Sequence, residues 1–327
     1  MSLPPFVIFI AGLVIIVFGA ELILRSSARI ASMLGVKPII IGLTVVAIGT
    51  STPELAVGIT AVSEGQPGLA VGNIAGTNIV NILFILGLSA ALRPLPLQLL
   101  SIKLDVPVMI VASFMLLGMS WDGVLTKNEG WILILSAVAY VIALIRVSRN
   151  EPPQVQADYE SQYKAEPPLK KYSGAVKFWN GVLLILGIAL TILGADLLVA
   201  GASNIARAFG VSDAVIGLTI VAIGTSAPEI VTTVVATLKD DRDVAVGNLI
   251  GSSITNILVI LGITCLAVPD GIAIDRQVLR FDLPLAAAVA IVCYPVFRSD
   301  HMVSRKEGIV FVLAYLIYLT TLLIFRT

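Results

Sequence analysis

The sequence predicts an all-α integral membrane protein of ten transmembrane helices, arranged as two inverted-topology repeats of five helices each. Three observations predict it: an apolar composition, ten apolar runs long enough to cross a membrane, and a long internal repeat. Of the 327 residues, 57% are hydrophobic and 13% are charged, and the mean hydropathy is +1.00. About a quarter of the residues of a soluble domain are charged. This composition excludes a soluble globular enzyme, a nucleic-acid-binding protein and a disordered protein.

The ten hydrophobic runs each have roughly the 17 to 25 residues that a helix needs to cross the hydrocarbon core. In chain order they cover residues 4–25, 39–62, 68–92, 104–120, 130–147, 178–200, 213–238, 243–267, 282–297 and 308–325. The first run has no basic segment before it and no small-residue cleavage site. We therefore interpret it as helix 1 and not as a signal peptide.

A polar, proline-containing stretch separates the fifth run from the sixth. It divides the chain into a first five-helix repeat (1–147), a linker (148–177) and a second five-helix repeat (178–327). Sixteen of the 21 Lys and Arg residues lie on the same side of the predicted membrane as this linker. Cytoplasmic loops are enriched in these residues. We therefore expect a multi-pass protein of the cell inner (plasma) membrane, with a cytoplasmic linker and both termini outside the cytoplasm.

The internal repeat is explicit. A shift of 175 residues aligns Gly42–Gly87 with Gly217–Gly262 without a gap, and 24 of the 46 aligned positions are identical. Because each half has an odd number of spans, the second copy enters the membrane from the opposite face. Inverted repeats of this kind are typical of secondary transporters, whose binding site lies near the membrane midplane.

Each copy of the repeat carries a glutamate directly after a proline, inside an apolar span: Glu54 and Glu229. A carboxylate near the bilayer centre costs at least ~2.5 kcal/mol. A helix broken by proline presents carbonyl groups and a negative dipole end, which favour a cation. Thr50 and Thr225 lie four positions earlier, on the same helix face. The alternative is a protonated glutamate that only supports helix packing, but a symmetric pair beside broken helices favours cation binding.

The following span of each half carries polar residues at a spacing of four, which forms one polar stripe on an apolar helix. These residues are Asn73, Thr77 and Asn81, and in the second half Asn248, Ser252 and Asn256. Such residues line a site or supply hydrogen bonds between helices. We assign Thr77, Asn81, Ser252 and Asn256 to the site, and Asn73 and Asn248 to packing.

Oxygen ligands alone suit hard ions such as Ca²⁺. The single histidine, His301, is predicted in a cytoplasmic loop, and Cys265 and Cys293 lack metal-site spacing, which argues against zinc and copper. Two carboxylates neutralise one Ca²⁺ or two Na⁺, so these ions can compete for one site. A third Na⁺ would make transport voltage-sensitive, by ~2.3 kcal/mol per charge per 100 mV.

Other acidic residues are expected to be structural. Asp105 and Asp282 each precede a proline by two positions and are expected to cap a helix N-terminus. Glu21 and Asp196 are expected near the ends of helices 1 and 6, where they cap or snorkel. Residues 239–243 form a charged cytoplasmic turn, which we interpret as a solvated loop.

The paired segments GTSTPE…GNIAGTNIVN and GTSAPEIV…GNLIGSSITN resemble the two alpha-repeats of the calcium/cation antiporter superfamily. The resemblance is greatest to the prokaryotic sodium/calcium exchanger type, and it covers nearly the whole chain. It implies transport by alternating access, in which helices 1 and 6 slide across a rigid core. An amide, Asn256, stands where many members carry an acid, and this speaks against potassium dependence.

The resemblance also implies four cation sites between helices 2, 3, 7 and 8. The calcium site would take the carboxylates of Glu54 and Glu229 and the carbonyls of Thr50 and Thr225. The sodium ligands would be Ala47, Ser51 and Thr77, mirrored by Ala222, Ser226 and Ser252, with Asn81 and Asn256 at the centre. The expected substrates are Ca²⁺ and Na⁺ and the expected environment is the lipid bilayer. No cofactor and no nucleic-acid partner are expected, and a monomer is sufficient.

Three alternatives remain at this point. A proton-coupled Ca²⁺/cation exchanger would use the same two glutamates as proton carriers. A cation channel would also have oxygen-lined helices, but channels generally build the pore by subunit symmetry. An intramembrane enzyme is disfavoured because the chain has no HExxH motif and no Ser/His pairing.

Overall fold

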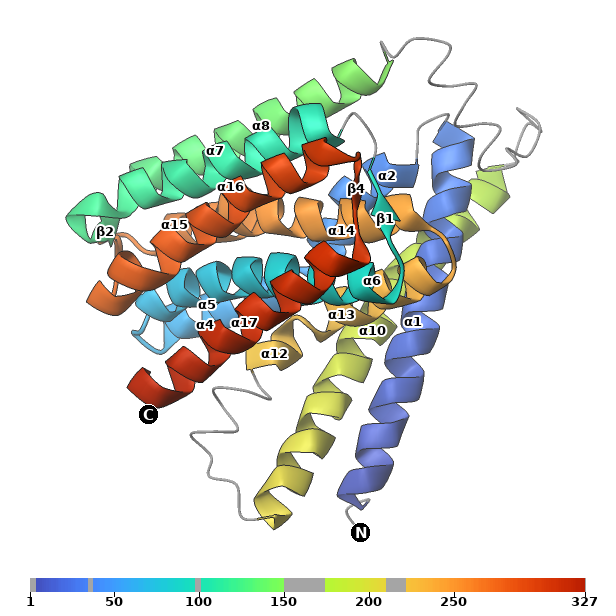
Figure 1. Cartoon of the computed structure of the whole chain (residues 1–327), viewed down its shortest axis with the longest axis horizontal. Coiled ribbons are helices and arrows are strands. Elements are labelled where there is room, and N and C mark those ends of the chain that lie inside the picture. Colours follow the sequence, from blue (N-terminus) through green and yellow to red (C-terminus); the bar gives the residue numbers. More distant parts are fainter. Residues whose placement is uncertain (1–3, 35–37, 98–100, 150–173, 210–221, 327) are drawn as a thin grey trace.

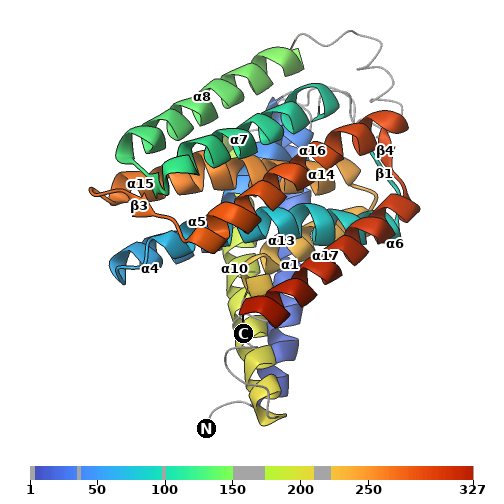
Figure 2. The same ribbon diagram turned by 60° about the vertical axis from the view of Figure 1, so that its left-hand side comes forward.

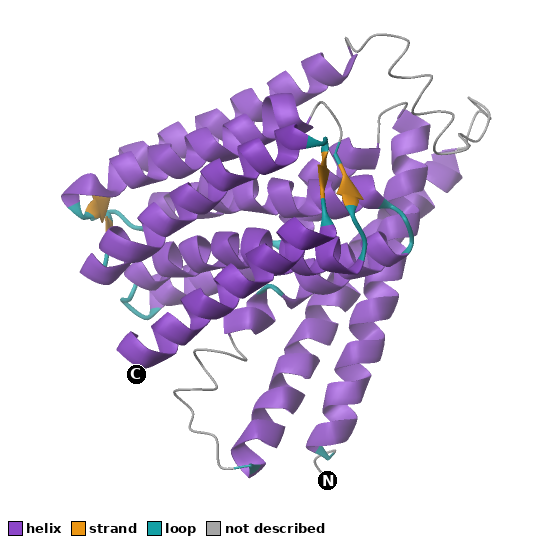
Figure 3. Ribbon diagram, in the orientation of Figure 1, coloured by secondary structure: helices purple, strands orange, loops and turns teal. Residues whose placement is uncertain are grey.

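The structure is a computed structural model that describes residues 4–34, 38–97, 101–149, 174–209 and 222–326. Most of the predicted 148–177 linker, and the predicted seventh span before residue 222, lie outside the described residues. The described chain is mainly helical, and Figure 3 shows its strands as short pairs towards two ends of the helical bundle.

The first half contains the helices α1 (Pro5–Leu34), α2 (Pro38–Ile41), α3 (Ala47–Thr50), α4 (Thr52–Ser63), α5 (Gly68–Ile79), α6 (Gly87–Leu92), α7 (Val106–Met119) and α8 (Lys127–Arg149). π-Helical segments η1 (Gly42–Val46), η2 (Val80–Leu86) and η3 (Ser101–Asp105), and the 3₁₀ turn η4 (Ser120–Asp122), connect some of them. The strands are β1 (Leu95–Pro96) and β2 (Val124–Leu125).

The second half contains α10 (Gly174–Ala208), α12 (Ala222–Thr225), α13 (Ala227–Leu238), α14 (Arg242–Thr255), α15 (Gly262–Ala267), α16 (Leu283–Ser299) and α17 (Arg305–Arg326). The π-helical segments are η6 (Asn256–Leu261) and η7 (Val278–Asp282), and the strands are β3 (Ile272–Ala273) and β4 (Met302–Val303).

Seven described helices are long and apolar enough to cross a membrane. They are Pro5–Leu34, Gly68–Leu92, Ile102–Asp122, Lys127–Val147, Gly174–Ala208, Val244–Ala267 and Val278–Ser299. The pair Gly42–Thr50 and Thr52–Ser63, bent by 45°, is long and apolar enough for a broken span or a re-entrant loop. The predicted seventh span is described only from Ala222, and the predicted tenth coincides with α17. The first and sixth helices, with 30 and 35 residues, run well past the predicted ends of their spans.

The two long helices α1 and α10 pack against each other and extend beyond the other helices (Figures 1 and 2). Glycines allow their backbones to touch. A Cβ atom on Gly194 would lie 2.5 Å from the backbone N of Ile16, and one on Gly201 would lie 2.5 Å from the backbone N of Phe9. Small residues permit such close approach in membranes, where helix association depends on packing. The order of the contacts shows that the two helices are antiparallel.

Two spans form the centre of the bundle: α5–η2–α6 and α14–η6–α15. They are the most buried of the long spans, with 78% and 83% of the apolar window buried. Helices α7, α8, α16 and α17 lie around them (Figure 2). The π-helical segments η2 and η6 begin at Val80 and Asn256, within the predicted polar stripes. π-Helical turns inside α-helices are frequent at functional sites because they reorient side chains.

The short strands connect the two halves. Strand β1 pairs with β4, and β2 pairs with β3, both antiparallel. Strand β3 follows α15 as β1 follows α6, and β4 precedes α17 as β2 precedes α8. Sequence positions related by the repeat therefore make related contacts in space.

The prediction that Asp105 and Asp282 cap helix N-termini is wrong. Both residues have helical backbone angles, and neither side chain caps a helix. The chain is already π-helical before each of them (η3 and η7), so no free N-terminus is left to cap. Instead, Asp105 accepts a hydrogen bond of 3.0 Å from the Tyr140 hydroxyl, and Asp282 one of 3.2 Å from Tyr318.

Candidate functional site

Two helix breaks organise the site. Ser51 (φ −80°, ψ 10°) separates α3 from α4, and Ser226 (φ −86°, ψ 6°) separates α12 from α13. A proline lies in the first turn of α4 and of α13, where its missing N–H costs nothing. Thr50 and Thr225 are the last residues of the short helices that precede the breaks, so their carbonyl groups lie at helix C-termini.

Glu54 and Glu229 lie in the first turn after each break and are fully buried, with 1% and 0% exposure. Ser51, three positions before Glu54, contacts Glu229, so the two helix breaks lie next to each other. Both oxygens of Glu54 and Oε2 of Glu229 are buried without a hydrogen-bond partner among the described residues. Because an uncompensated carboxylate is very costly inside a protein, these oxygens need a cation or a proton.

Hydroxyl groups from both halves surround the Glu229 carboxylate. Its Oε1 accepts hydrogen bonds from Ser51 Oγ at 3.3 Å and from Ser252 Oγ at 3.4 Å. Thr50 Oγ1 lies 3.4 Å from Ser252 Oγ and donates to Asn248 Oδ1 at 3.1 Å. The structure thus brings together predicted residues that lie about half the chain apart in sequence.

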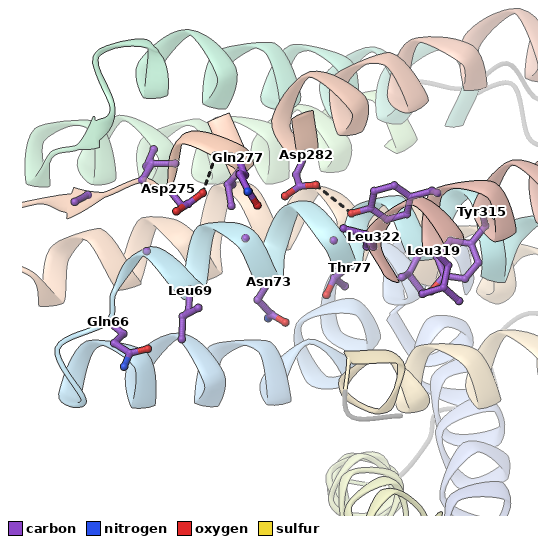
Figure 4. A pocket seen from close by; sticks show the side chains of 18 residues that line it. Gln66, Leu69, Asn73, Thr77, Asp275, Gln277, Asp282, Tyr315, Leu319 and Leu322 are labelled. Carbon is purple, nitrogen blue, oxygen red and sulfur yellow. Dashed lines mark hydrogen bonds between the residues drawn. The ribbon is translucent and has the colours of Figure 1, made fainter. Parts of the chain in front are cut away.

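The outer asparagines of the two stripes differ. Asn248 is fully buried, and besides its bond from Thr50 it donates to Thr233 Oγ1 at 3.3 Å. Asn73 instead lines a cavity of about 770 Å³ between α5, η7 and α17, together with the predicted site residue Thr77. Figure 4 shows Asn73 and Thr77 on the same side of α5. Asn248, which the sequence assigned to packing, therefore contacts Thr50, one of the predicted site hydroxyls.

The central asparagines are both fully buried. The Asn256 side chain donates from Nδ2 to Asn78 Oδ1 at 3.3 Å, and its Oδ1 has no partner within the described chain. Neither amide atom of Asn81 has a partner there. Asn78 was not predicted from the sequence, because it lies one position after Thr77 and so falls outside the polar stripe, whose members are four residues apart. The sequence feature that could have identified it is its alignment with Ser253: the first repeat has an asparagine where the second has a serine.

The remaining predicted ligands lie at the same breaks. Ala47 is buried, and its carbonyl accepts from the Ser51 N–H at 3.0 Å. Ser226 is buried, and its Oγ has no partner among the residues described. Ala222 begins α12, and its side chain lies outside the described part.

A second cavity, of about 390 Å³, lies between α4, α10 and α12. Pro53 and Thr225, which flank the two helix breaks, line it. Of the described residues that line it, Asp196 alone is charged. Asp196 therefore lies in the middle of α10 and faces a cavity beside the candidate site, and not near a helix end as expected.

Glu21 also differs from its prediction as a capping or snorkelling residue. It lies within α1, well before the helix ends at Leu34. It forms ion pairs with Arg25 and with Lys239, which lies in the turn between α13 and α14. In the same turn Asp240 pairs with Arg93 at 2.9 Å. The predicted solvated loop is thus connected by charge to α1 and to the end of α6.

The atoms at this site that could bind a metal ion are carboxylate, hydroxyl, amide and carbonyl oxygens, which are the ligands that hard cations prefer. In the described ranges no group of three or more His, Cys, Asp or Glu residues is placed to hold a metal ion. The arrangement is therefore two carboxylates with neutral oxygen ligands around them.

Known proteins resemble this chain along nearly its whole length. The sequence profile of the family described as "Sodium/calcium exchanger protein" matches residues 4–146 and 179–324. The putative antiporter CaxA of Alkalimonas amylolytica is 35% identical, over 94% of this chain and 95% of that protein. The sodium/calcium exchanger MaX1 of Methanosarcina acetivorans is 31% identical, over 97% and 98%. The inner membrane protein YrbG of Escherichia coli K12 is 32% identical, over 96% and 95%.

Among solved structures, the sodium-calcium exchanger NCX_Mj in a zero-Na⁺, zero-Ca²⁺ soak matches with a TM-score of 0.81 and 28% identity. The match covers 98% of this chain and all of that one. The profile covers most of the chain, and the helical architecture agrees with that of a membrane exchanger. This chain therefore belongs to the sodium/calcium exchanger family.

Proposed function

We propose that the protein is a secondary active antiporter that exchanges Na⁺ for Ca²⁺ across the inner membrane. One observation carries the proposal: two buried glutamates, one from each half of the chain, with three carboxylate oxygens that lack a partner among the described residues. The names of MaX1 and NCX_Mj, both sodium/calcium exchangers, support the choice of ions.

In this proposal Ca²⁺ binds between Glu54 and Glu229, with the carbonyl groups of Thr50 and Thr225. Na⁺ binds on either side of that position. The sodium ligands are Ala47, Ser51 and Thr77 on one side, Ala222, Ser226 and Ser252 on the other, with Asn81 and Asn256 at the centre. Two carboxylates balance one Ca²⁺ or two Na⁺, so occupancy by one ion excludes the other.

We further propose ten spans in two inverted repeats, 1–147 and 178–327, joined by a linker over 148–177. The related contacts of β1–β4 and β2–β3 support this, as do those of Tyr140–Asp105 and Tyr318–Asp282. With both termini outside the cytoplasm, the Glu21–Lys239 pair lies towards the cytoplasmic face. Access alternates as α1 and α10 move together against the core, and the cavity beside Asp196 is an access route for cations.

The test is calcium uptake by reconstituted protein. Purified protein in liposomes loaded with Na⁺ is diluted into Na⁺-free buffer, and ⁴⁵Ca²⁺ uptake is followed. Parallel samples contain internal K⁺, or carry a proton gradient without Na⁺. We expect uptake with internal Na⁺ only, and its loss in Glu54→Gln and Glu229→Gln.

Uptake driven by protons alone would replace this proposal with the proton-coupled exchanger, with the same two glutamates as carriers. Absence of uptake under every gradient would refute calcium as the substrate. A passive calcium flux that needs no counter-ion would indicate a channel.

A further inference from the structure

The amide of Asn78 connects the two halves of the chain beside the central asparagines. Its Nδ2 donates to the backbone carbonyl of Ser253 at 3.1 Å, and its Oδ1 accepts from Asn256 Nδ2 at 3.3 Å. All three residues are buried, with Asn78 at 6% exposure and Ser253 at 1%. Asn78 lies in α5 and the other two lie at the junction of α14 and η6.

The direction of this chain of hydrogen bonds is fixed at one end. A backbone carbonyl can only accept, so the Asn78 side chain must present its NH₂ group to Ser253. Its oxygen then faces Asn256, which must answer with its own NH₂ group. The oxygen of Asn256 is thereby turned the other way, where it is buried and has no partner among the described residues.

We propose that Asn78 is a positioning residue, which orients the Asn256 amide so that its oxygen faces the cation site and which selects an uncharged amide at this position. The inference rests on the proposed function. An aspartate at position 256 would place an acceptor against the Asn78 oxygen. If the Asn78 amide flipped to donate its NH₂ group to that aspartate, its own oxygen would face the Ser253 carbonyl. Two acceptors would then oppose each other there instead. The site therefore keeps two carboxylates, the charge that one Ca²⁺ or two Na⁺ balance.

The repeat-related position shows the contrast. Ser253 corresponds to Asn78, and its hydroxyl donates to Leu249 O within its own helix at 2.9 Å. Asn81 corresponds to Asn256, and within the described chain neither of its amide atoms has a partner. Among the described residues, hydrogen bonds thus orient the Asn256 amide, and none orients that of Asn81.

A double-mutant cycle tests the inference with Asn78→Ser, Asn256→Asp and the double variant. Serine is chosen because the second repeat carries it at this position. Ser253→Ala is the matched control, since it keeps the backbone carbonyl that accepts from Asn78. One measurement is the melting temperature in detergent without Na⁺ or Ca²⁺. The other is Na⁺-driven ⁴⁵Ca²⁺ uptake per reconstituted protein over a range of Ca²⁺ concentrations, which gives the half-saturating concentration and the maximal rate.

We expect Asn256→Asp to lower uptake by at least about tenfold and to lower the melting temperature, because two acceptors then face each other. The double variant should take up calcium at least about threefold faster than Asn256→Asp alone and should regain part of the lost melting temperature. Alone, Asn78→Ser should raise the half-saturating Ca²⁺ concentration about three- to tenfold, with the maximal rate within about twofold. The control should stay within about twofold of wild type in both uptake parameters.

Additive effects of the two substitutions, or wild-type uptake by Asn256→Asp, would overturn the inference. Recovery of melting temperature without recovery of uptake would also overturn it, since the contact would then serve packing only. If the wild type shows no Na⁺-driven uptake, the proposed function fails, and with it the cation-site role of Asn78. The melting temperatures then still decide whether Asn78 and Asn256 form the pair.

Discussion

Ser51 in the first helix break donates a hydrogen bond to Glu229 beside the second, at 3.3 Å and across 178 positions of sequence. The hydroxyl of one half thus supports the carboxylate of the other. The reciprocal contact is absent from the described structure, where the Ser226 hydroxyl is buried without a partner. Ser51 and Ser226, which the repeat makes equivalent in sequence, therefore differ in their contacts among the described residues.

This difference predicts unequal effects of two matched substitutions. Ser51→Ala should lower the free energy of unfolding in ion-free detergent by about 0.5–1.5 kcal/mol, the net value of one hydrogen bond. Ser226→Ala should change it by less than about 0.5 kcal/mol, because no such bond is lost. Chemical denaturation of the two variants measures both values. Equal losses would contradict the asymmetry.

Substitution of either buried glutamate is expected to impair transport and to leave the fold intact. Glu54→Gln and Glu229→Gln should each lower Na⁺-driven calcium uptake at least about 100-fold, since an amide removes the charge that balances the cation. Size-exclusion profiles should remain those of the wild type. Glu64→Gln is the control, because Glu64 is exposed at the end of α4. This variant should transport calcium as the wild type does. Persistent uptake in either site variant would remove that glutamate from the proposed site.

The contact between α1 and α10 predicts that Gly194 tolerates no side chain. In Gly194→Ala the new Cβ atom would lie 2.5 Å from the backbone N of Ile16, which cannot move aside as a flexible side chain could. We expect a loss of about 1–3 kcal/mol or more, seen as a lower melting temperature and aggregation on size exclusion. Gly181→Ala in the same helix is the control, because a Cβ atom at that position would meet no neighbouring described residue within 4 Å. Equal stability of the two variants would refute the close contact.

The two Tyr–Asp pairs predict a graded loss of stability. Tyr140→Phe removes the hydroxyl that donates to Asp105, whose side chain is fully buried. We expect a cost of about 1–3 kcal/mol, because a buried carboxyl group loses one of its hydrogen bonds. Tyr318→Phe removes the equivalent bond of Asp282, but Tyr318 is only half-buried and the cost should be smaller. Melting temperatures compare the two variants, and the reverse order would contradict this explanation.

Part of the fold and of the site could be predicted from the sequence because the signals are local. A membrane span needs a continuous apolar run, so several predicted spans agree closely with the helices, as 68–92 does with Gly68–Leu92. A carboxylate inside such a run is costly enough to identify Glu54 and Glu229 as candidates. The prolines located both helix breaks because they cannot donate the backbone hydrogen bond.

The sequence by itself thus located several of the long apolar helices, the internal repeat and the two buried acids. The tertiary structure decided which atom meets which: Ser51 with Glu229, Asn78 with Asn256, and Glu21 with Lys239. It also overturned the capping role of Asp105, since the turn before this residue is itself helical. The physical reason is that helix periodicity fixes the direction of a side chain on its own helix. The partner it meets depends on the packing of a second helix, which no local pattern specifies.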